Sequence, residues 1–224
     1  EDGENKEVHG VIDTGGRLFV NLGSEGISLD VGRHRIVMVV AGDLTYAEQF
    51  IEVIRPQARV VVTDIDGTLT SSEYAALTDV AGLPPAEAHP GAADMLWAFA
   101  IRGYKVFYLT ARPEWMTPLT REWLPLRGFP PGVLHTTLSK IGAVGSSATD
   151  AKTKELAWLH ATTTIVPSYA FGNKTSDVAA YGGAGIEPTG CYYYELDGDA
   201  KGGTIHADYT ALVAVAEQAP LACF

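Results

Sequence analysis

The stretch that decides the fold is Val60-Val61-Val62-Thr63-Asp64-Ile65-Asp66-Gly67-Thr68-Leu69-Thr70. Its β-branched beginning predicts a buried strand. Asp64 and Asp66 follow two positions apart, and side chains at that spacing in extended backbone point the same way. Burying two acids together is costly unless a cation or proton compensates them, and Gly67 permits a sharp turn beside them. An Asp-Gly turn alone would account for Asp66 but not for Asp64. The stretch therefore predicts a site for a hard cation such as Mg²⁺ at the end of a strand.

Composition and charge limit the classes of protein to consider. The chain has 224 residues, of which 46% are hydrophobic and 19% charged, as in a globular protein with a substantial core. The net charge of −11 argues against a nucleic-acid partner, which needs a basic face. The same acidity would repel an anionic membrane unless positive charge is gathered locally. No apolar run approaches the roughly 18 residues of a membrane span.

Two textures divide the chain, and we expect a small β-rich region over residues 1–57 and a catalytic domain over residues 58–224. The first region should form a small sandwich-like or antiparallel sheet from strands near residues 7–13, 18–22, 33–40 and 49–54. The second alternates strands with helices, which predicts an α/β fold with a Rossmann-like parallel sheet covered on both faces. Its expected strands are 58–63, 104–109, 133–136, 168–171 and 191–196, with helices near 91–102, 116–126, 152–160, 176–181 and 209–218.

Ligands in such sheets bind where the strands end, so the loops after Thr63, Leu109 and Phe171 are the candidate site. The first of these loops, Asp64–Thr70, resembles motif I of the haloacid dehalogenase superfamily. The later pieces make the chain similar to the catalytic domain of the lipins, which are phosphatidate phosphatases. These pieces are Tyr108-Leu109-Thr110-Ala111-Arg112, Lys152, and Ala170-Phe171-Gly172-Asn173-Lys174-Thr175-Ser176-Asp177 with Tyr181. The resemblance runs from about Val60 to Ile186, and it differs in having Lys174 where lipins have arginine.

The resemblance implies an Mg²⁺-dependent phosphatase with an aspartyl-phosphate intermediate. Asp64 would be the nucleophile and Asp66 the general acid and base, with Thr110 and Lys152 completing the catalytic set. The substrate phosphate would be bound by residues of the first two motifs, and the metal by acids and an amide of the first and fourth motifs. The phosphate-binding set is Gly67, Thr68, Ala111 and Arg112, and the metal set is Asp64, Asp66, Asn173 and Asp177.

Each later residue also has a physical reason to belong to such a site. The Thr110 hydroxyl at a strand end can hold phosphoryl oxygens, whereas Arg112 could either fork onto a phosphate or pair with an acid. Lys152 would neutralise charge between nucleophile and phosphate, and Lys154 would point elsewhere on the same helix. Asn173 offers a neutral oxygen to the metal. Asp177 lies one helical turn later and could act directly or through a water.

The intervals between motifs bear on the substrate. Neither Asp64–Thr110 nor Thr110–Lys152 leaves room for a folded cap, so the site should admit bulky substrates such as a lipid in a bilayer. Of the large side chains after the second motif, Trp115 and Met116 could contact lipid headgroups, whereas Trp123 is better explained as core. The alternatives are a capless phosphatase for a soluble or polymer-end phosphate, and a non-catalytic phosphatidate-binding module like related domains of phosphatidylinositol-transfer proteins. The presence of both Asp64 and Asp66 favours an enzyme.

The only cysteines are Cys191 and Cys223. They are either two buried thiols or one disulfide that holds the C-terminal tail. A disulfide would place the protein outside the cytoplasm, with a leader removed before Glu1, and two thiols would fit the cytoplasm. We expect an extracytoplasmic location slightly more than a cytoplasmic one.

Overall fold

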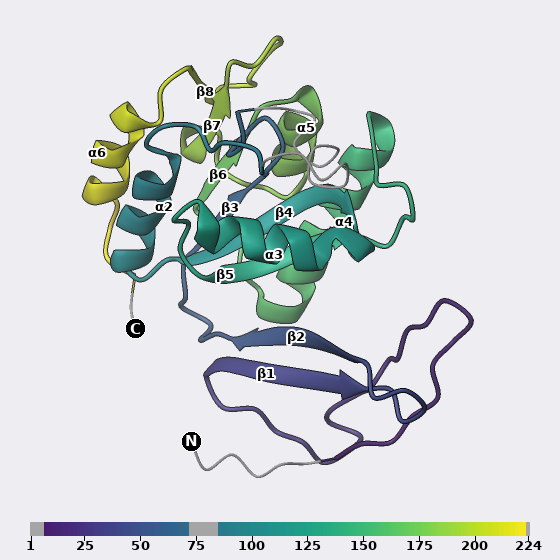
Figure 1. The fold of residues 1–224 in the computed structure, drawn as a ribbon. Coiled ribbons are helices and arrows are strands. Elements are labelled where there is room, and N and C mark those ends of the chain that lie inside the picture. The colour runs from purple at the N-terminus through teal and green to yellow at the C-terminus, as the bar shows by residue number, and fades with distance from the viewer. Residues whose placement is uncertain (1–6, 72–84, 223–224) are drawn as a thin grey trace. The chain divides into compact units, whose positions relative to one another are not determined.

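The computed structural model describes residues 7–71 and 85–222 and divides the chain into two compact units, Glu1–Ile54 and Arg55–Phe224. In the first unit, β1 (Gly32–Val39) pairs antiparallel with β2 (Tyr46–Val53) in a register that sets Gly32 opposite Val53. Burial alternates along β1, as expected for a strand with one covered face. Two of the four predicted strands are thus formed, and the unit is a two-stranded sheet (Figure 1).

The strands predicted at residues 7–13 and 18–22 are not formed. The carboxylate of Asp13 accepts hydrogen bonds from the backbone N–H groups of Gly15 and Arg17, at 2.7 and 2.9 Å. Such a side-chain bond to the local backbone competes with strand pairing. This part of the chain therefore forms a turn, and it pairs with no strand among the described residues.

The second unit is built on a six-stranded parallel sheet with strand order β5-β4-β3-β6-β7-β8. The predicted α/β class is confirmed, with a final short strand that the sequence did not indicate. The strands are β3 (Val60–Thr63), β4 (Lys105–Pro113), β5 (Gly132–Thr137), β6 (Tyr169–Gly172), β7 (Cys191–Tyr194) and β8 (Thr204–His206). Strand β3, which forms the first four residues of the stretch Val60–Thr70, lies between β4 and β6. All four of its residues are buried.

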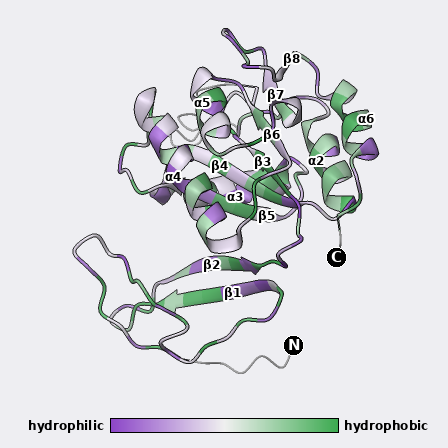
Figure 2. Ribbon diagram, turned by 180° about the vertical axis from the view of Figure 1, so that it is seen from behind, coloured by the Kyte–Doolittle hydropathy of each residue, from purple (hydrophilic) through white to green (hydrophobic). Residues whose placement is uncertain are grey.

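Five described helices cover the two faces of this sheet. They are α2 (Ala92–Ile101), α3 (Thr117–Leu126), α4 (Ser146–Thr163), α5 (Thr175–Gly183) and α6 (Thr210–Gln218). The largest core cluster joins Val61 and Tyr108 of the sheet to Phe99 of α2, Trp123 of α3 and Leu212 of α6. Because strand side chains alternate between faces, the neighbours of these sheet residues face α4 and α5, which pack against each other. Figure 2 shows the hydrophobic colour along α2 and α6, which lie side by side.

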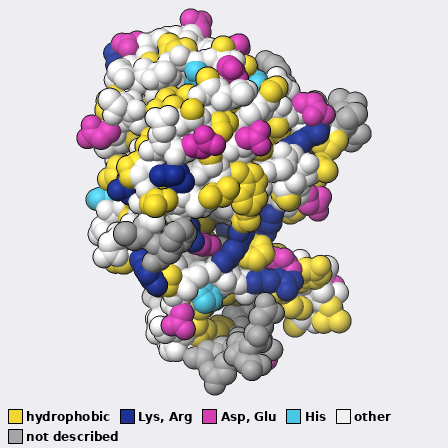
Figure 3. All heavy atoms as spheres, turned by 90° about the vertical axis from the view of Figure 1, so that its left-hand side faces the viewer, with side chains coloured by type: hydrophobic (Ala, Val, Ile, Leu, Met, Phe, Trp, Pro, Cys, Tyr) yellow, Lys and Arg dark blue, Asp and Glu magenta, His cyan; other side chains and the backbone are white. Residues whose placement is uncertain are grey.

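No large cap interrupts the sheet in the part of the chain that the structure describes. Residues 64–71 and 85–91 contain only the bridge between Thr70 and Ala88, and residues 138–145 contain no helix or strand. None of the described helices is both long and apolar enough to cross a membrane. On the face in Figure 3, acidic side chains are scattered among hydrophobic and basic ones, and no broad basic field appears on it.

Of the two cysteines on which the disulfide prediction depends, Cys223 lies outside the described residues. Cys191 is a buried free cysteine at the start of β7, and its thiol donates to the Glu187 carbonyl oxygen at 3.6 Å. Burial raises the pKa of this thiol. Its reactivity is therefore lower than that of an exposed cysteine.

Candidate active site

The predicted residues gather at the carboxyl end of the sheet, on three neighbouring strands. Asp64 directly follows β3, Thr110 lies in β4, and Asn173 directly follows β6. Strand β4 runs four residues further than predicted, and its pairing with β5 is irregular between Leu109 and Pro113. The second motif therefore lies on an irregular strand end, which turns its side chains toward β3.

Asp64 is buried and held by a lysine from another element. Lys152 of α4 places its Nζ 2.8 Å from Asp64 Oδ1 and 2.5 Å from Asp177 Oδ1. The lysine itself is buried, whereas Lys154, two residues later, is exposed. The Lys152 ammonium thus bridges the first and the fourth motif, and the sequence-based choice of Lys152 over Lys154 agrees with this geometry.

Burial dominates the protonation of Asp64. Burial is the largest effect and raises the pKa of this carboxyl, the nearby carboxylates of Asp177 and Asp66 act in the same direction, and the Lys152 charge acts against them. Together they set the pKa of Asp64 at about 7. Burial alone would lower the pKa of Lys152, but Asp177 and Asp64 raise it well above its usual range. The lysine therefore stays charged and supports the ionised form of Asp64.

Arg112 forms a bidentate ion pair with Asp66. The Nε of Arg112 donates to Asp66 Oδ2 at 2.9 Å, and its Nη2 donates to Oδ1 at 2.7 Å. Its Nη1 donates to Thr120 Oγ1 of α3 at 3.0 Å, and the guanidinium is buried. The Thr110 hydroxyl also donates to Asp66, at 3.2 Å. Of the two alternatives for Arg112, the structure shows pairing with an acid, and that acid belongs to the site itself.

These five residues, Asp64, Asp66, Arg112, Lys152 and Asp177, form what we call the charged cluster. It contains three carboxylates and two cationic side chains. With all five ionised it carries one uncompensated negative charge in a buried place, which is costly unless another cation is present. The charge balance of the cluster thus leaves room for a metal ion.

The loop after Asp64 is shaped by hydroxyl groups. Gly67 takes a positive φ of 74°, and its N–H donates to Thr70 Oγ1 at 2.9 Å. Thr68 Oγ1 lies 3.3 Å from Asp64 Oδ2 and 3.1 Å from Asn173 Oδ1. The buried Tyr209 hydroxyl donates to the Thr68 carbonyl oxygen at 2.7 Å. This tyrosine anchors the loop from far along the sequence, and no sequence pattern indicated it.

Asp177 contacts Lys152 and also the backbone at the start of α5. Its Oδ2 accepts the backbone N–H groups of Asn173 and Lys174, both at 3.0 Å. This acid lies so close to Gly172 that a Cβ there would meet the Asp177 Cβ at 2.5 Å. The glycine in the fourth motif is therefore required for the approach of Asp177 to the strand end.

The donor set suits Mg²⁺, which takes oxygen ligands and keeps several waters. Asp64 and Asn173 offer a carboxylate and an amide oxygen that both contact Thr68. The side-chain oxygens of the other two predicted ligands, Asp66 and Asp177, are engaged with Arg112 and Lys152. Across residues 7–71 and 85–222, no three His, Cys, Asp or Glu side chains form a metal cluster, so an ion here would rely on few protein ligands.

A pocket of about 720 Å³ lies beside the charged cluster and shares Gly67 and Asn173 with the predicted site. The acids of the cluster do not line it. Thr68 contacts both Asp64 and the lining residue Asn173, and so links the cluster to the pocket. The lining is polar: it includes the hydroxyl groups of Ser71, Ser146, Thr149, Thr175 and Ser176, the charged Lys174, Glu195 and Asp197, and the ring of His89.

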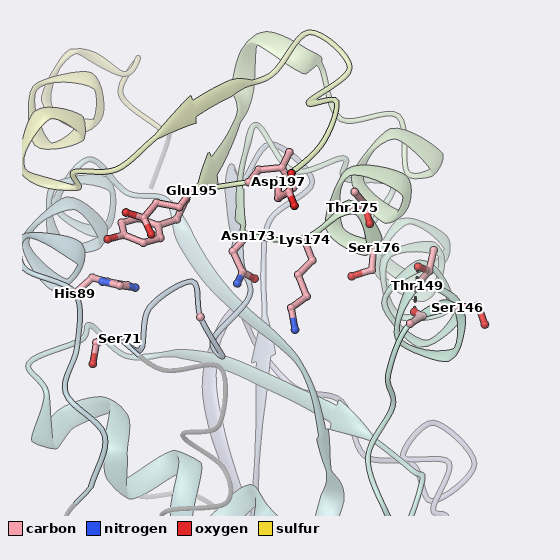
Figure 4. A pocket seen from close by; sticks show the side chains of 14 residues that line it. Ser71, His89, Ser146, Thr149, Asn173, Lys174, Thr175, Ser176, Glu195 and Asp197 are labelled. Carbon is pink, nitrogen blue, oxygen red and sulfur yellow. Dashed lines mark hydrogen bonds between the residues drawn. The ribbon is translucent and has the colours of Figure 1, made fainter.

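In Figure 4, Ser71 and His89 lie at one side of the pocket and Ser146 and Thr149 at the other. The second pair comes from the first turn of α4, which begins at Ser146 rather than near Lys152 as predicted. His89 packs against Tyr194, with ring centroids 4.0 Å apart, and burial lowers the pKa of this histidine. Sequence reasoning missed most of this lining, because hydroxyl groups in the first turns of helices and a histidine in a loop carry no motif of their own.

The sequence is similar to parts of membrane-associated phosphatidylinositol transfer proteins. Membrane-associated phosphatidylinositol transfer protein 1 of Rattus norvegicus is 34% identical over 124 residues, which is 55% of this chain and 9% of that protein. Membrane-associated phosphatidylinositol transfer protein 2 of Homo sapiens is 30% identical over 182 residues, or 81% of this chain and 13% of that protein. The chain therefore spans only a small part of the length of these relatives.

Among solved structures, a putative had-like phosphatase from Mesorhizobium loti covers 85% of this chain and 95% of its own, with a TM-score of 0.54 and 15% identity. This likeness confirms the predicted haloacid dehalogenase-type fold. A family model described as "PITM 1-3, LNS2 domain" matches residues 61–195, which include every predicted site residue. The chain belongs to the family of LNS2 domains of PITM 1-3.

Proposed function

We propose that this chain is an Mg²⁺-dependent phosphomonoester hydrolase that acts through an aspartyl-phosphate on Asp64. The observation that carries the proposal is the buried Asp64 carboxylate at the end of β3, 2.8 Å from the Lys152 ammonium. A carboxylate at this place can attack a phosphoryl group, and the lysine beside it can offset the repulsion between nucleophile and phosphate.

The chemistry has two steps. In the first, which begins with Asp66 protonated, an oxygen of Asp64 attacks phosphorus, the bond to the leaving alkoxide breaks, and Asp66 transfers its proton to that alkoxide. In the second, Asp66 takes a proton from water, which attacks phosphorus, so that inorganic phosphate leaves and Asp64 is regenerated. Both steps require Asp66 to give up part of its two-pronged contact with Arg112.

Asp64 and Asn173 would hold the metal ion. When bound, Mg²⁺ supplies positive charge that offsets the charge of the phosphoryl oxygens. Lys152 favours the ionised form of Asp64, and Asp177 keeps Lys152 in place. Thr110 donates to Asp66 and orients its carboxylate. We assign the substrate phosphate to Gly67 and Thr68, on the loop after β3, and to Ala111 in the last part of β4.

We assign phosphatidate or a similar lipid phosphate as the substrate. This assignment rests on the resemblance to lipins, on relatives named as membrane-associated phosphatidylinositol transfer proteins, and on the absence of a large cap over the described part of the sheet. A pocket of about 720 Å³ with hydroxyl and charged lining suits a polar headgroup. A soluble or polymer-end phosphate is the alternative substrate.

A second function has an observation in its favour. Both oxygens of Asp66 are engaged by Arg112, and the related proteins are named for lipid transfer. In a non-catalytic phosphatidate-binding module this pairing would be permanent, and the pocket would bind the headgroup without hydrolysis. The two functions differ in turnover, so one assay separates them.

The assay measures phosphate released from phosphatidate in mixed detergent micelles, with Mg²⁺ and with excess EDTA. The enzyme should turn over only with the metal, since the site offers oxygen ligands and carries an unbalanced negative charge. Full turnover in EDTA would contradict the metal requirement. Binding of phosphatidate with no phosphate release under any condition would favour the non-catalytic module, and release only from a soluble phosphomonoester would contradict the lipid assignment.

A further inference from the structure

Exposed apolar side chains gather next to the pocket, on the segment between β5 and α4. Ile141 and Val144 are 94% and 84% exposed, and Leu138 is 65% exposed. Trp115, which follows β4, is 51% exposed and donates its indole N–H to the Lys140 carbonyl oxygen at 2.8 Å. We call Trp115, Leu138, Ile141 and Val144 the apolar rim.

The segment that carries the apolar rim is tied to the site. The Ala143 N–H donates to the carbonyl oxygen of Ala111, in the second motif, at 3.0 Å. The Val144 N–H and carbonyl oxygen both bond to the Ser147 hydroxyl, at 3.0 and 2.8 Å. Hydrogen bonds thus hold the backbone of this segment in place, whereas its large side chains are exposed to solvent. Of the two predicted lipid contacts, Trp115 is exposed and Met116 is buried, and Trp123 is buried as predicted.

The charge of this segment differs from that of the chain as a whole. Residues 138–147 contain the exposed Lys140 and no acid, in a chain of net charge −11. The nearest acid in sequence on the β4 side, Glu114, is half-buried. The apolar rim thus combines aliphatic side chains and an indole, and a cation, Lys140, lies beside it. This is the composition of protein surfaces that enter the interface of a lipid bilayer.

The apolar rim is continuous with the pocket. Val144 leads directly into Gly145 and Ser146, which line it, and Figure 4 shows Ser146 and Thr149 at its edge. The pocket lining is more polar than apolar, and Leu196 is the only aliphatic side chain among its described residues. A lipid with its headgroup in the pocket would need an apolar medium immediately outside, and the apolar rim marks the side on which that medium lies.

We propose that the apolar rim inserts into the surface of a lipid bilayer and presents the pocket to lipid headgroups. The proposal deepens the proposed function by naming how the lipid reaches the site, and it rests on that function only for the identity of the lipid. A protein partner would bury a broad area. The apolar rim instead consists of four exposed side chains, three of which lie on one short segment.

The experiment measures binding of the whole chain to vesicles of phosphatidylcholine with phosphatidylserine, neither of which carries a phosphomonoester. The double variant Ile141→Ser/Val144→Ser should bind these vesicles at least about tenfold more weakly, since each buried branched side chain contributes roughly that factor to partitioning. It should hydrolyse a soluble phosphomonoester at the wild-type rate, because neither residue belongs to the catalytic set. Unchanged near-UV circular dichroism would show that the variant is folded.

Two variants serve as controls. Ile101→Ser removes a side chain of similar exposure, 73%, from the last residue of α2, which lies toward the opposite edge of the sheet. It should leave vesicle binding unchanged. Asp64→Asn should also bind vesicles like the wild type, because it changes only the buried cluster.

The outcomes separate the two proposals. Loss of vesicle binding in the double variant but not in Ile101→Ser supports the membrane role, even if no phosphatase activity is found. Wild-type vesicle binding by the double variant, or equal weakening by Ile101→Ser, would overturn it. Light scattering gives a third result: if the wild type is a dimer that the double variant dissociates, the apolar rim is a contact between two copies and the membrane proposal is wrong.

Discussion

The charged cluster and the pocket beside it lie at the same edge of the sheet and differ in almost every physical respect. In the cluster, each acid bonds to a cationic side chain, and Lys152 and Arg112 are buried. In the pocket, the lining is hydroxyl groups and partly exposed charges on loops and helix starts. The cluster therefore holds reactive groups in fixed positions, while the pocket can adapt to a ligand.

The difference has an energetic consequence. Removing one partner of a buried ion pair leaves an uncompensated charge, which costs about 3–5 kcal/mol, whereas a surface substitution usually changes stability by less than about 0.5 kcal/mol. Substitutions in the cluster should therefore affect chemistry and folding together. Substitutions in the pocket should affect only the binding of substrate.

The largest effect is expected at the nucleophile. Asp64→Asn keeps the side-chain volume but removes the attacking carboxylate, so the rate should fall by about 10²-fold or more. The measurement is phosphate release from a soluble phosphomonoester, which does not depend on membrane contact. Asp94→Asn, an exposed acid in the first turn of α2, is the matched control and should keep full activity. Asp64→Asn with more than a tenth of the wild-type rate would rule out the covalent mechanism.

The next effect concerns stability. Lys152→Met leaves Asp64 and Asp177 without their shared cation, so the free energy of unfolding should fall by about 3–5 kcal/mol. Lys154→Met, two residues further along α4 and exposed, should change it by less than about 0.5 kcal/mol. Urea unfolding of the two variants measures the difference. Equal midpoints would mean that the ion pairs in the cluster contribute nothing to the fold.

The smallest effect is expected in the pocket. Lys174→Gln removes an exposed charge from the lining, so KM for a phosphomonoester should rise a few-fold with little change in kcat, in line with the roughly 0.2–1 kcal/mol of exposed charge pairs. Steady-state kinetics measures both constants. A fall in kcat as large as that of Asp64→Asn would place Lys174 with the cluster and remove the distinction between the two regions.

Much of the candidate site could be predicted because its parts obey local rules. Side chains two positions apart in extended backbone point to the same side, so Asp64 and Asp66 could be predicted to face the same place. The alternation of strands and helices placed Thr110 and Asn173 at the same sheet edge. Helical spacing allowed only one of Lys152 and Lys154 to face the site, and the resemblance to lipins selected Lys152, which is buried, whereas Lys154 is exposed. In the N-terminal unit local rules were insufficient, because alternation over residues 7–22 did not come with partner strands.

The α/β class, the strand end at which Asp64 and Asp66 lie, and the residue types that meet there follow from the sequence alone. Only the tertiary structure decided how they pair. The two-pronged contact of Arg112 with Asp66, the bridge of Lys152 between Asp64 and Asp177, and the bond from Tyr209 to the Thr68 loop all join separate elements. Such contacts depend on how helices pack on the sheet. Packing is set by the sum of many small interactions over the whole core, which no local pattern records.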